Sequence, residues 1–148
     1  MSNLYAAYGS NISERQMRKR VGRNAQKVGK AWLVDYRLVF RGMKNKAVAN
    51  IEPAEGGRVP IYLWRLNETA EDILDRYEGV ANHCYRQETV RVEYGGIWLD
   101  DVMVYVMVPG KSLNSPSEQY YQTIVEGYLM QRMPLQILEE ARDRSTKK

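Results

Sequence analysis

The sequence predicts an α+β fold in which a mostly antiparallel, strongly curved sheet carries helices at its edges. Its 148 residues suffice for a single compact domain with a real core. β-rich runs follow one another through the middle of the chain without the regular alternation of strands and helices that a parallel sheet needs. Helix-start patterns stand near both ends of the chain.

The N-terminal segment predicts a strand, a loop and a helix. Residues 3–8 are mostly apolar and aromatic, and Gly9 ends this run. Residues 13–16 then have the form of a capping box, in which a serine and a side chain three residues later satisfy the first turn of a helix.

The middle of the chain predicts the sheet. Four β-rich runs occupy residues 28–34, 36–40, 48–52 and 59–66. Two more, residues 85–94 and 97–108, alternate well and flank Gly95-Gly96, which is the pattern of a β-hairpin with a two-glycine turn.

A helix is predicted between these two groups of strands. It runs over residues 70–77, after capping residues at 67–69 and before a stop at Gly79. Helical spacing places three apolar residues on its core face, namely Ile73, Leu74 and Tyr77.

The C-terminal segment predicts two more helices. The first starts with Pro116 at its first position, extends to Met133 and ends at Pro134. The second covers residues 135–142. We therefore expect a domain of residues 1–142 and a charged, frayed tail of residues 143–148.

Composition restricts the compartment of the protein. Cys84 is the single cysteine, so no internal disulfide forms, and no Cys/His cluster suggests a metal site. The N-terminus lacks the basic and apolar pattern of a signal peptide, and no run approaches the roughly 20 apolar residues of a membrane span. We expect a cytoplasmic protein without a membrane partner.

A basic segment offers one alternative function. Seven basic residues gather with a single acid among them, which is compatible with a nucleic-acid patch; they are Arg15, Arg18, Lys19, Arg20, Arg23, Lys27 and Lys30. The segment lacks interleaved aromatic residues, and a short basic helix is more often a solvated face. Nucleic-acid binding is therefore the less favoured reading.

Common catalytic templates are missing from the sequence. It has no nucleophile elbow, no phosphate-binding P-loop and no dinucleotide-binding glycine motif. The single histidine, His83, precedes Cys84, and neighbours in an extended chain point to opposite sides. We therefore favour a surface histidine beside a buried thiol over a catalytic dyad.

Glu78 is a candidate for proton transfer. It follows core-facing Leu74 by four residues at the end of the predicted helix, so its side chain points inward. Burial and the negative end of the helix dipole both raise the pKa of such a carboxyl toward neutrality. The alternative is a structural glutamate satisfied by an arginine or a backbone amide, and position alone favours that alternative.

The loop at residues 8–11 also has two interpretations. Gly9 allows a ligand to approach the backbone closely, and Ser10 and Asn11 stand where a helix entrance binds a carboxylate or an oxyanion. The alternative is an ordinary turn with capping side chains.

Taken in order, these motifs resemble the γ-glutamylcyclotransferase-like superfamily. The matching pieces span about residue 4 to residue 140: residues 5–11 (YAAYGSN), 74–79 (LDRYEG), Tyr85-Arg86, Pro116-Ser117, Tyr120, Gly127 and Met133-Pro134. The short chain is similar to the γ-glutamylamine cyclotransferase and AIG2-like branches as well. One departure is Ile61, which stands where family members often have glycine.

The resemblance implies a mixed, barrel-like sheet and a reaction, without cofactor or metal, that releases 5-oxoproline from a small γ-glutamyl compound. By the same resemblance, Glu78 matches the catalytic glutamate. The substrate-binding loop and pocket tyrosines correspond to Tyr5, Ala6, Ala7, Tyr8, Gly9, Ser10, Asn11, Tyr85 and Tyr120.

We therefore expect a cyclotransferase in which the substrate's own α-amine attacks its γ-carbonyl carbon, while Glu78 takes up and returns protons. Two alternatives keep the fold: a non-catalytic binder of a small amino-acid-like ligand, and an enzyme for a γ-glutamyl group on a biosynthetic intermediate. Nucleic-acid binding ranks last. Both a monomer and a homodimer are compatible with the sequence.

Overall fold

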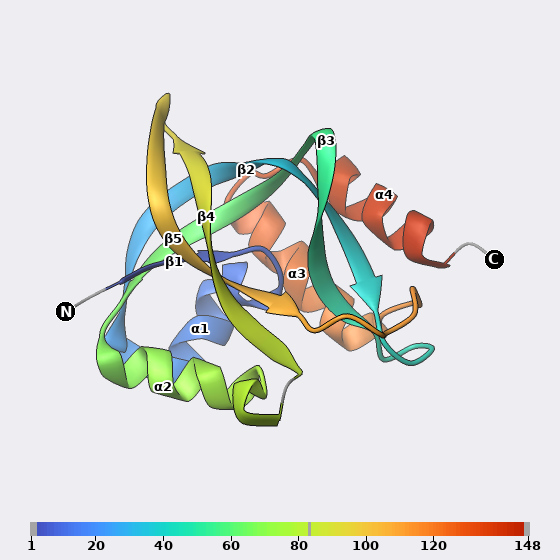
Figure 1. Ribbon diagram of the computed structural model, residues 1–148, viewed down its shortest axis with the longest axis horizontal. Coiled ribbons are helices and arrows are strands. Elements are labelled where there is room, and N and C mark those ends of the chain that lie inside the picture. The colour runs from blue at the N-terminus through green and yellow to red at the C-terminus, as the bar shows by residue number, and fades with distance from the viewer. Residues whose placement is uncertain (1–2, 83, 147–148) are drawn as a thin grey trace.

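Five strands close into a barrel-like sheet in the computed structural model, which describes residues 3–82 and 84–146 (Figure 1). The strands, in the order in which they neighbour one another, are β1 (Asn3–Ala7), β3 (Val48–Leu66), β2 (Ala25–Arg41), β4 (Tyr85–Tyr94) and β5 (Ile97–Met107). Every pair is antiparallel except β1 and β5, which run parallel and close the ring. The predicted α+β class and mixed, mostly antiparallel sheet are confirmed.

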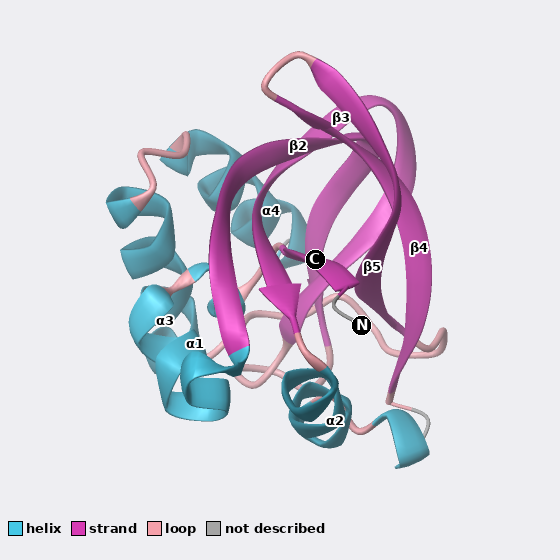
Figure 2. Cartoon of the chain, turned by 90° about the vertical axis from the view of Figure 1, so that its left-hand side faces the viewer, coloured by secondary structure: helices cyan, strands magenta, loops and turns pink. Residues whose placement is uncertain are grey.

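Helices cover one side and one end of the barrel. They are α1 (Glu14–Val21), α2 (Glu68–Tyr77), α3 (Glu118–Met130) and α4 (Leu135–Thr146), with short 3₁₀ turns η1 (Ser10–Ile12), η2 (Gly22–Asn24) and η3 (Val80–Asn82). Figure 2 shows α1, α3 and α4 on one side of the sheet, and α2 across the end of the strands. Contacts of α1 with α2, and of α3 with η1, bring the loop after β1 close to the end of α2.

The sheet contains two long strands where the sequence predicts four short ones. Strand β2 continues through Asp35, whose left-handed backbone (φ 67°) forms a bulge. Before the bulge Val34 pairs with Arg58 of β3, and after it Tyr36 pairs with Pro53. The Asp35 carboxylate accepts the Gly56 N–H at 3.0 Å. Because a bulge bends a strand without ending its pairing, β2 and β3 curl around the barrel.

The predicted hairpin between β4 and β5 is confirmed. Tyr94 pairs with Ile97 across Gly95 and Gly96, whose positive φ angles of 59° and 86° suit a tight two-residue turn. The core extends to both sides of the sheet, because residues 59–64 of β3 are all buried. One face of this strand lines the barrel interior and the other is covered by helices and loops.

Helix α2 ends where the sequence predicts but begins two residues earlier, at Glu68. The Asn67 side chain accepts the Ala70 N–H at 2.9 Å, and Gly79 follows the helix with φ 65°, the left-handed conformation typical of a C-terminal stop. Leu74 is fully buried. Tyr77 is not on the core face as expected: it is 59% exposed, and its ring stacks against Arg20 of α1.

Helix α3 is shorter than predicted at both ends. Its N-cap is Ser117, which accepts the Tyr120 N–H, whereas Ser115 binds Asn45 in the preceding β2–β3 turn. It ends at Met130, because the backbone turns left-handed at Arg132 (φ 56°). The predicted span of residues 116–133 therefore included two irregular flanks.

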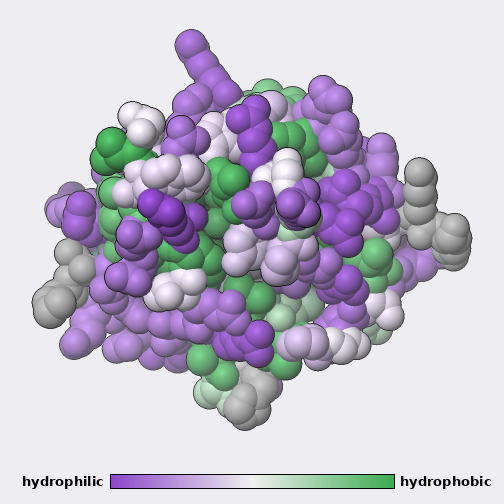
Figure 3. All heavy atoms as spheres, turned by 45° about the horizontal axis from the view of Figure 1, so that its top comes forward, coloured by the Kyte–Doolittle hydropathy of each residue, from purple (hydrophilic) through white to green (hydrophobic). Residues whose placement is uncertain are grey.

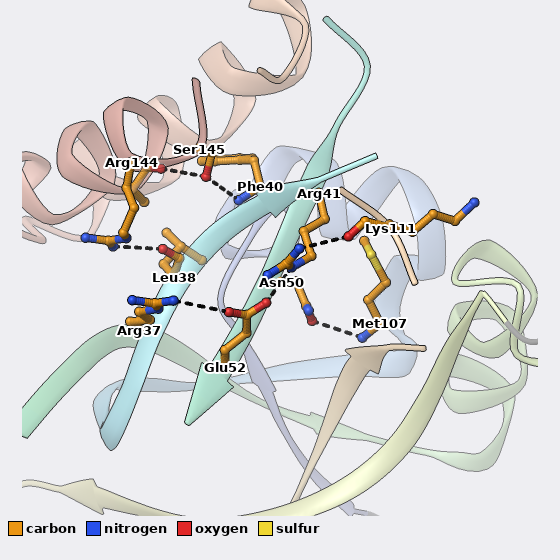
Figure 4. Close-up of polar contacts among 11 residues, drawn as sticks. Arg37, Leu38, Phe40, Arg41, Asn50, Glu52, Met107, Lys111, Arg144 and Ser145 are labelled. Carbon is orange, nitrogen blue, oxygen red and sulfur yellow. Dashed lines mark hydrogen bonds and ion pairs between the residues drawn. The ribbon is translucent and has the colours of Figure 1, made fainter. Parts of the chain in front are cut away.

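Helix α4 continues four residues beyond its predicted end, so residues 143–146 are not a frayed tail. The Ser145 hydroxyl is buried and accepts the Phe40 N–H at 2.8 Å, and Arg144 donates to the Leu38 carbonyl at 2.9 Å (Figure 4). These bonds anchor the last turn to β2, which the charged sequence alone does not indicate. Residues 147–148 of the predicted tail lie outside the described residues.

The surface is mixed in character. The face shown in Figure 3 is mostly hydrophilic, with small hydrophobic areas between charged side chains. Exposed large apolar side chains sit on different elements, for example Met43 in the β2–β3 turn, Ile97 in the hairpin and Leu129 in α3. No helix within residues 3–82 and 84–146 has the length and apolarity needed to cross a bilayer.

Candidate active site

A pocket at the end of α2 collects most of the residues that the sequence singled out. The empty space in and in front of it, open solvent at the mouth included, is about 310 Å³. Its walls come from the loop after β1, from β3, β4 and β5, and from the ends of α2 and α3. The lining residues are Tyr5, Tyr8, Gly9, Ser10, Asn11, Ala49, Glu78, Tyr85, Tyr105 and Tyr120.

Two residues of the predicted substrate loop do not line this pocket. Ala6 and Ala7 are buried in β1, where they pair with Leu63 and Tyr62 of β3. Their role is to build the barrel wall, and the loop that faces the pocket begins at Tyr8. Ile61, which departs from the family resemblance, is also buried in the core and lies outside the pocket wall.

Glu78 projects from the C-terminal cap of α2 into the pocket. Its backbone N–H bonds the Leu74 carbonyl at 2.9 Å, which continues the helix by one residue and fixes where the side chain leaves it. Among the described residues, no hydrogen bond or ion pair satisfies its carboxylate. Burial raises the pKa of Glu78 from 4.5 to about 7, although the positive charge of Arg20 acts in the opposite direction. The structural alternative, a glutamate satisfied by an arginine or an amide, is therefore not what the geometry shows.

Asn11 is the most constrained residue of the loop. Its carbonyl accepts Trp64 Nε1 at 2.9 Å, and its side-chain amide donates to the Tyr5 hydroxyl at 3.0 Å. Its side-chain oxygen accepts Arg20 Nη1 at 2.8 Å. With three separate partners, Asn11 holds the η1 turn against both β3 and α1. The first hydrogen bond of this turn runs from the Ile12 N–H to the Gly9 carbonyl. The N–H groups of Gly9 and Ser10 come before it and therefore have no partner within the turn.

Tyr85 and Tyr120 bind the two backbone groups of a single residue, Ala49. The Tyr85 hydroxyl donates to the Ala49 carbonyl at 2.7 Å, and the Tyr120 hydroxyl accepts the Ala49 N–H at 3.0 Å. Both groups point to the same edge of β3, opposite the edge that contacts Phe40 of β2. The two hydroxyls therefore lie side by side where a further strand would otherwise pair.

These bonds give the pocket hydroxyls opposite hydrogen-bonding characters. Tyr85 uses its proton on Ala49, so its oxygen faces the pocket as an acceptor, whereas Tyr120 keeps its proton and is a donor. Tyr5 likewise accepts from Asn11 and keeps its proton. Burial raises the pKa of Tyr120 to about 12 and that of Tyr5 further, so both stay neutral.

A second tyrosine pair closes the pocket wall on the β5 side. The Tyr8 hydroxyl donates to the Tyr105 carbonyl at 2.6 Å, and the Tyr105 hydroxyl donates to Asp75 Oδ1 of α2 at 2.6 Å. Burial raises the pKa of both tyrosines. These bonds connect β1, β5 and α2, the elements that surround Glu78.

Sequence reasoning missed Tyr105, Ala49 and Arg20. Tyr105 stands within the valine-rich alternation of β5, and Ala49 acts only through its backbone, so neither has a local pattern that indicates a site. Arg20 was assigned to a solvated basic face. Its spacing of three residues from buried Met17 places it near the core face of α1, which was an available indication.

Cys84 and the potential metal ligands were the other candidates for chemistry among the described residues. Cys84 is exposed, in contrast to the buried thiol expected, because it lies in the turn between η3 and β4. His83 lies outside the described residues. Within the part of the chain that the structure describes, no three side chains of His, Cys, Asp or Glu gather as a metal site.

Most of the basic side chains that suggested a nucleic-acid patch are engaged within the chain. Arg15 pairs with Glu126 at 3.1 Å, and Lys27 pairs with Glu14 at 3.3 Å. Arg18 donates to two backbone carbonyls in and after the η2 turn, at 2.7 and 2.6 Å. These contacts give the charges a structural role in attaching α1.

Comparisons with known proteins agree with this architecture. A solved structure described as gamma-glutamyl cyclotransferase is 27% identical, with a TM-score of 0.84 and coverage of 95% of this chain and 86% of that one. An uncharacterized Homo sapiens protein is 28% identical, with a TM-score of 0.83 and the same coverages. YkqA from Bacillus subtilis is 25% identical, with a TM-score of 0.83, covering 97% of this chain and 54% of YkqA. A sequence search among curated proteins gave no match.

The family model described as AIG2-like matches residues 58–140, which is more than half of the chain. This region contains Glu78, Tyr85 and Tyr120. The chain therefore belongs to the AIG2-like family, and it has the fold of a gamma-glutamyl cyclotransferase.

Proposed function

We propose that this protein is a cyclotransferase that converts a γ-glutamyl amine or γ-glutamyl amino acid into 5-oxoproline and the free amine. The observation that carries the proposal is the Glu78 carboxyl, which faces a tyrosine-lined pocket without a partner among the described residues. A pKa of about 7 makes it half-ionised near neutral pH, which suits a group that must first accept and then donate a proton.

The pocket favours an internal nucleophile over one supplied by the protein. Burial raises the pKa of each lining tyrosine, which makes these hydroxyls poor nucleophiles. Ser10 is the remaining hydroxyl of the wall, and no histidine lines the pocket in the part of the chain that is described. A substrate that carries its own amine needs only to be folded and deprotonated, and such positioning supplies much of the rate of a cyclisation.

In the proposed reaction the α-nitrogen of the substrate bonds to its γ-carbonyl carbon, and the γ-amide C–N bond breaks. The α-ammonium group loses two protons as it becomes a lactam N–H, and the leaving nitrogen gains two as it departs as an ammonium ion. Glu78 carries these protons one after the other and ends in its starting state. No oxidant, reductant or cofactor enters the balance.

The two kinds of tyrosine hydroxyl suggest how the substrate lies. Tyr5 and Tyr120 have free O–H donors, which suit the α-carboxylate and the oxyanion that forms on the γ-carbonyl. Tyr85 presents an acceptor, which suits the α-ammonium group as it approaches Glu78. Tyr120→Phe should therefore lower kcat by about a hundredfold, as removal of an oxyanion donor does, and Tyr85→Phe should cost less.

The test is chromatography for 5-oxoproline after incubation of the purified protein with γ-glutamyl amino acids, γ-glutamyl-ε-lysine and glutathione. Glu78→Gln should fold normally and form no product. Glu68→Gln, on an exposed position of the same helix, is the matched control and should retain full turnover. Undiminished turnover by Glu78→Gln would refute the assignment. Heat of binding without product across the whole panel would instead favour the non-catalytic binder.

A further inference from the structure

Arg20 lies behind the pocket wall and connects two of its parts. It extends from α1, and its Nη1 donates to the Asn11 side-chain oxygen at 2.8 Å. Its guanidinium also stacks on the ring of Tyr77, 4.7 Å from the ring centre. Tyr77 immediately precedes Glu78, so Arg20 joins the loop after β1 to the end of α2.

Hydrogen-bond direction is transmitted from Arg20 to the pocket. Arginine only donates, so the Asn11 oxygen must face it, and the Asn11 amide nitrogen is then turned toward Tyr5. The Tyr5 hydroxyl accepts that bond at 3.0 Å, which leaves its own proton for another acceptor. Because Tyr5 lines the pocket, this proton is available to a ligand that enters it. A positive charge at one end polarises each bond in such a chain.

The charge of Arg20 also acts on Glu78. Among the described residues, five tyrosine hydroxyls and one arginine face Glu78. The tyrosines are Tyr5, Tyr8, Tyr85, Tyr105 and Tyr120, from β1 and the loop after it, β4, β5 and α3, and the arginine is Arg20 from α1. Asp75, on the same helix as Glu78, is bound to Tyr105. The tyrosines are neutral because burial raises their pKa values. Arg20 therefore provides the charge that favours ionised Glu78 among the described residues.

We propose that Arg20 is a positioning residue for the reaction proposed above: through Asn11 it directs the Tyr5 O–H into the pocket as a donor to a substrate oxygen, and its stacking on Tyr77 holds a positive charge beside the end of α2 that carries Glu78. The residue touches neither the substrate nor the reacting atoms. Its contribution combines a fixed hydrogen-bond direction with a nearby positive charge, which glutamine cannot supply and lysine supplies only in part.

The first experiment compares Arg20→Gln and Arg20→Lys with Lys19→Gln, a charge removal at an exposed position of the same helix. Circular dichroism and thermal unfolding establish that each variant is folded. We expect kcat/KM to fall by on the order of tenfold or more for Arg20→Gln, as for other residues that orient a catalytic group. In a plot of kcat/KM against pH, the fall in activity on the acidic side should move to higher pH in Arg20→Gln. In Arg20→Lys this acidic limb should stay in place, and the activity should be intermediate. An unchanged profile and rate in Arg20→Gln would overturn the proposal.

The second experiment asks whether Arg20 acts through Tyr5. In a double-mutant cycle, Arg20→Gln should cost much less in a Tyr5→Phe background than in the wild type, because the donor that it directs is already missing. The cycle is measured at a pH well above the acidic limb, so that the ionisation of Glu78 does not contribute. Additive losses in kcat/KM would show that Arg20 does not act through this hydroxyl and would overturn that part of the proposal.

A third readout needs no turnover and separates the two proposals. The carbon-13 shift of the Glu78 carboxyl, followed by NMR against pH, should titrate at higher pH in Arg20→Gln than in the wild type. A protein that forms no 5-oxoproline but shows this shift would contradict the proposed function and support the charge role of Arg20. A protein that forms 5-oxoproline with the same titration in both forms would contradict that charge role.

Discussion

Replacing Glu78 with glutamine should make the folded protein more stable above neutral pH. The carboxyl has a pKa of about 7 in the folded chain, against 4.5 as its ordinary value, because burial disfavours the charged form. Each pKa unit corresponds to about 1.36 kcal/mol, so ionised Glu78 lowers the stability of the native state by about 3 kcal/mol. Glutamine has nearly the same shape and no charge, and therefore avoids this penalty.

The sign and the pH window follow from the two pKa values. Below pH 4.5 the carboxyl is protonated in both folded and unfolded chains, and the variant and the wild type should have similar stability. Between pH 4.5 and about 7 the folded chain binds more protons than the unfolded chain, so the wild type loses stability as pH rises. Above pH 7 the full difference is present.

Urea unfolding at pH 4, 6 and 8 measures this difference directly. At pH 8 the gain should approach about 3 kcal/mol, or on the order of 10 °C in Tm for a chain of this size. The exposed Glu68→Gln variant is the control and should show no pH-dependent gain. If Glu78→Gln is no more stable than the wild type at pH 8, then the carboxyl is not desolvated and the acid–base argument loses its basis.

Three further substitutions test the packing around the site. Gly127→Ala should destabilise the protein by about 1–3 kcal/mol, because its Cβ would lie 2.8 Å from Ile12 and α3 would have to move away from the pocket loop; a higher Tm would contradict this. Ser145→Ala should lower the free energy of unfolding in urea by about 1–3 kcal/mol, because the Phe40 N–H loses its partner. An unchanged free energy of unfolding would support the original prediction that the C-terminal residues are frayed. Asn67→Ala should cost about 1 kcal/mol by removing the cap of α2, and unchanged unfolding would argue against that cap.

The inward direction of the Glu78 side chain is predictable because the information needed is local, whereas its assignment as the catalytic glutamate required the family resemblance. Leu74 establishes the buried face of α2, and Gly79 ends the helix. Glu78 follows Leu74 by four positions, so it lies on the same side and faces the pocket. The same holds for the loop at residues 9–11, where strand, glycine and helix start are adjacent. In both cases a few neighbouring residues determine where the side chains and amides point.

The tyrosine positions follow from contacts that no local pattern shows. Tyr85 and Tyr120 meet at Ala49, which is 36 residues from the first and 71 from the second, and only the family resemblance pointed to them. The resemblance also included Ala6 and Ala7, although their pairing with Leu63 and Tyr62 places both in the barrel wall. A motif conveys membership of a site, whereas the pairing register decides which of its residues face the ligand.

Breaks in the β pattern were harder to interpret. The backbone departs from ordinary strand geometry at Asp35, and the β-rich runs of the sequence are interrupted at residue 35 and at residues 53–58. In the structure the Asp35 carboxylate binds the Gly56 N–H, and both strands continue past the bulge. The same residue types occur in turns and in bulges, because both need left-handed or unpaired backbone. The sequence alone therefore does not distinguish a bulge within a strand from the end of that strand.

The amino-acid composition gives a further indication of the site, namely an excess of tyrosine over phenylalanine. The chain has eleven tyrosines and one phenylalanine, and five of the tyrosines line this one pocket. An aromatic ring excludes water and so raises the pKa of Glu78, while a hydroxyl on the same ring binds the backbone or a ligand. Phenylalanine would supply only the first property, and serine or asparagine only the second. A site that must desolvate a carboxyl and still hold a polar substrate therefore favours tyrosine at each of these positions.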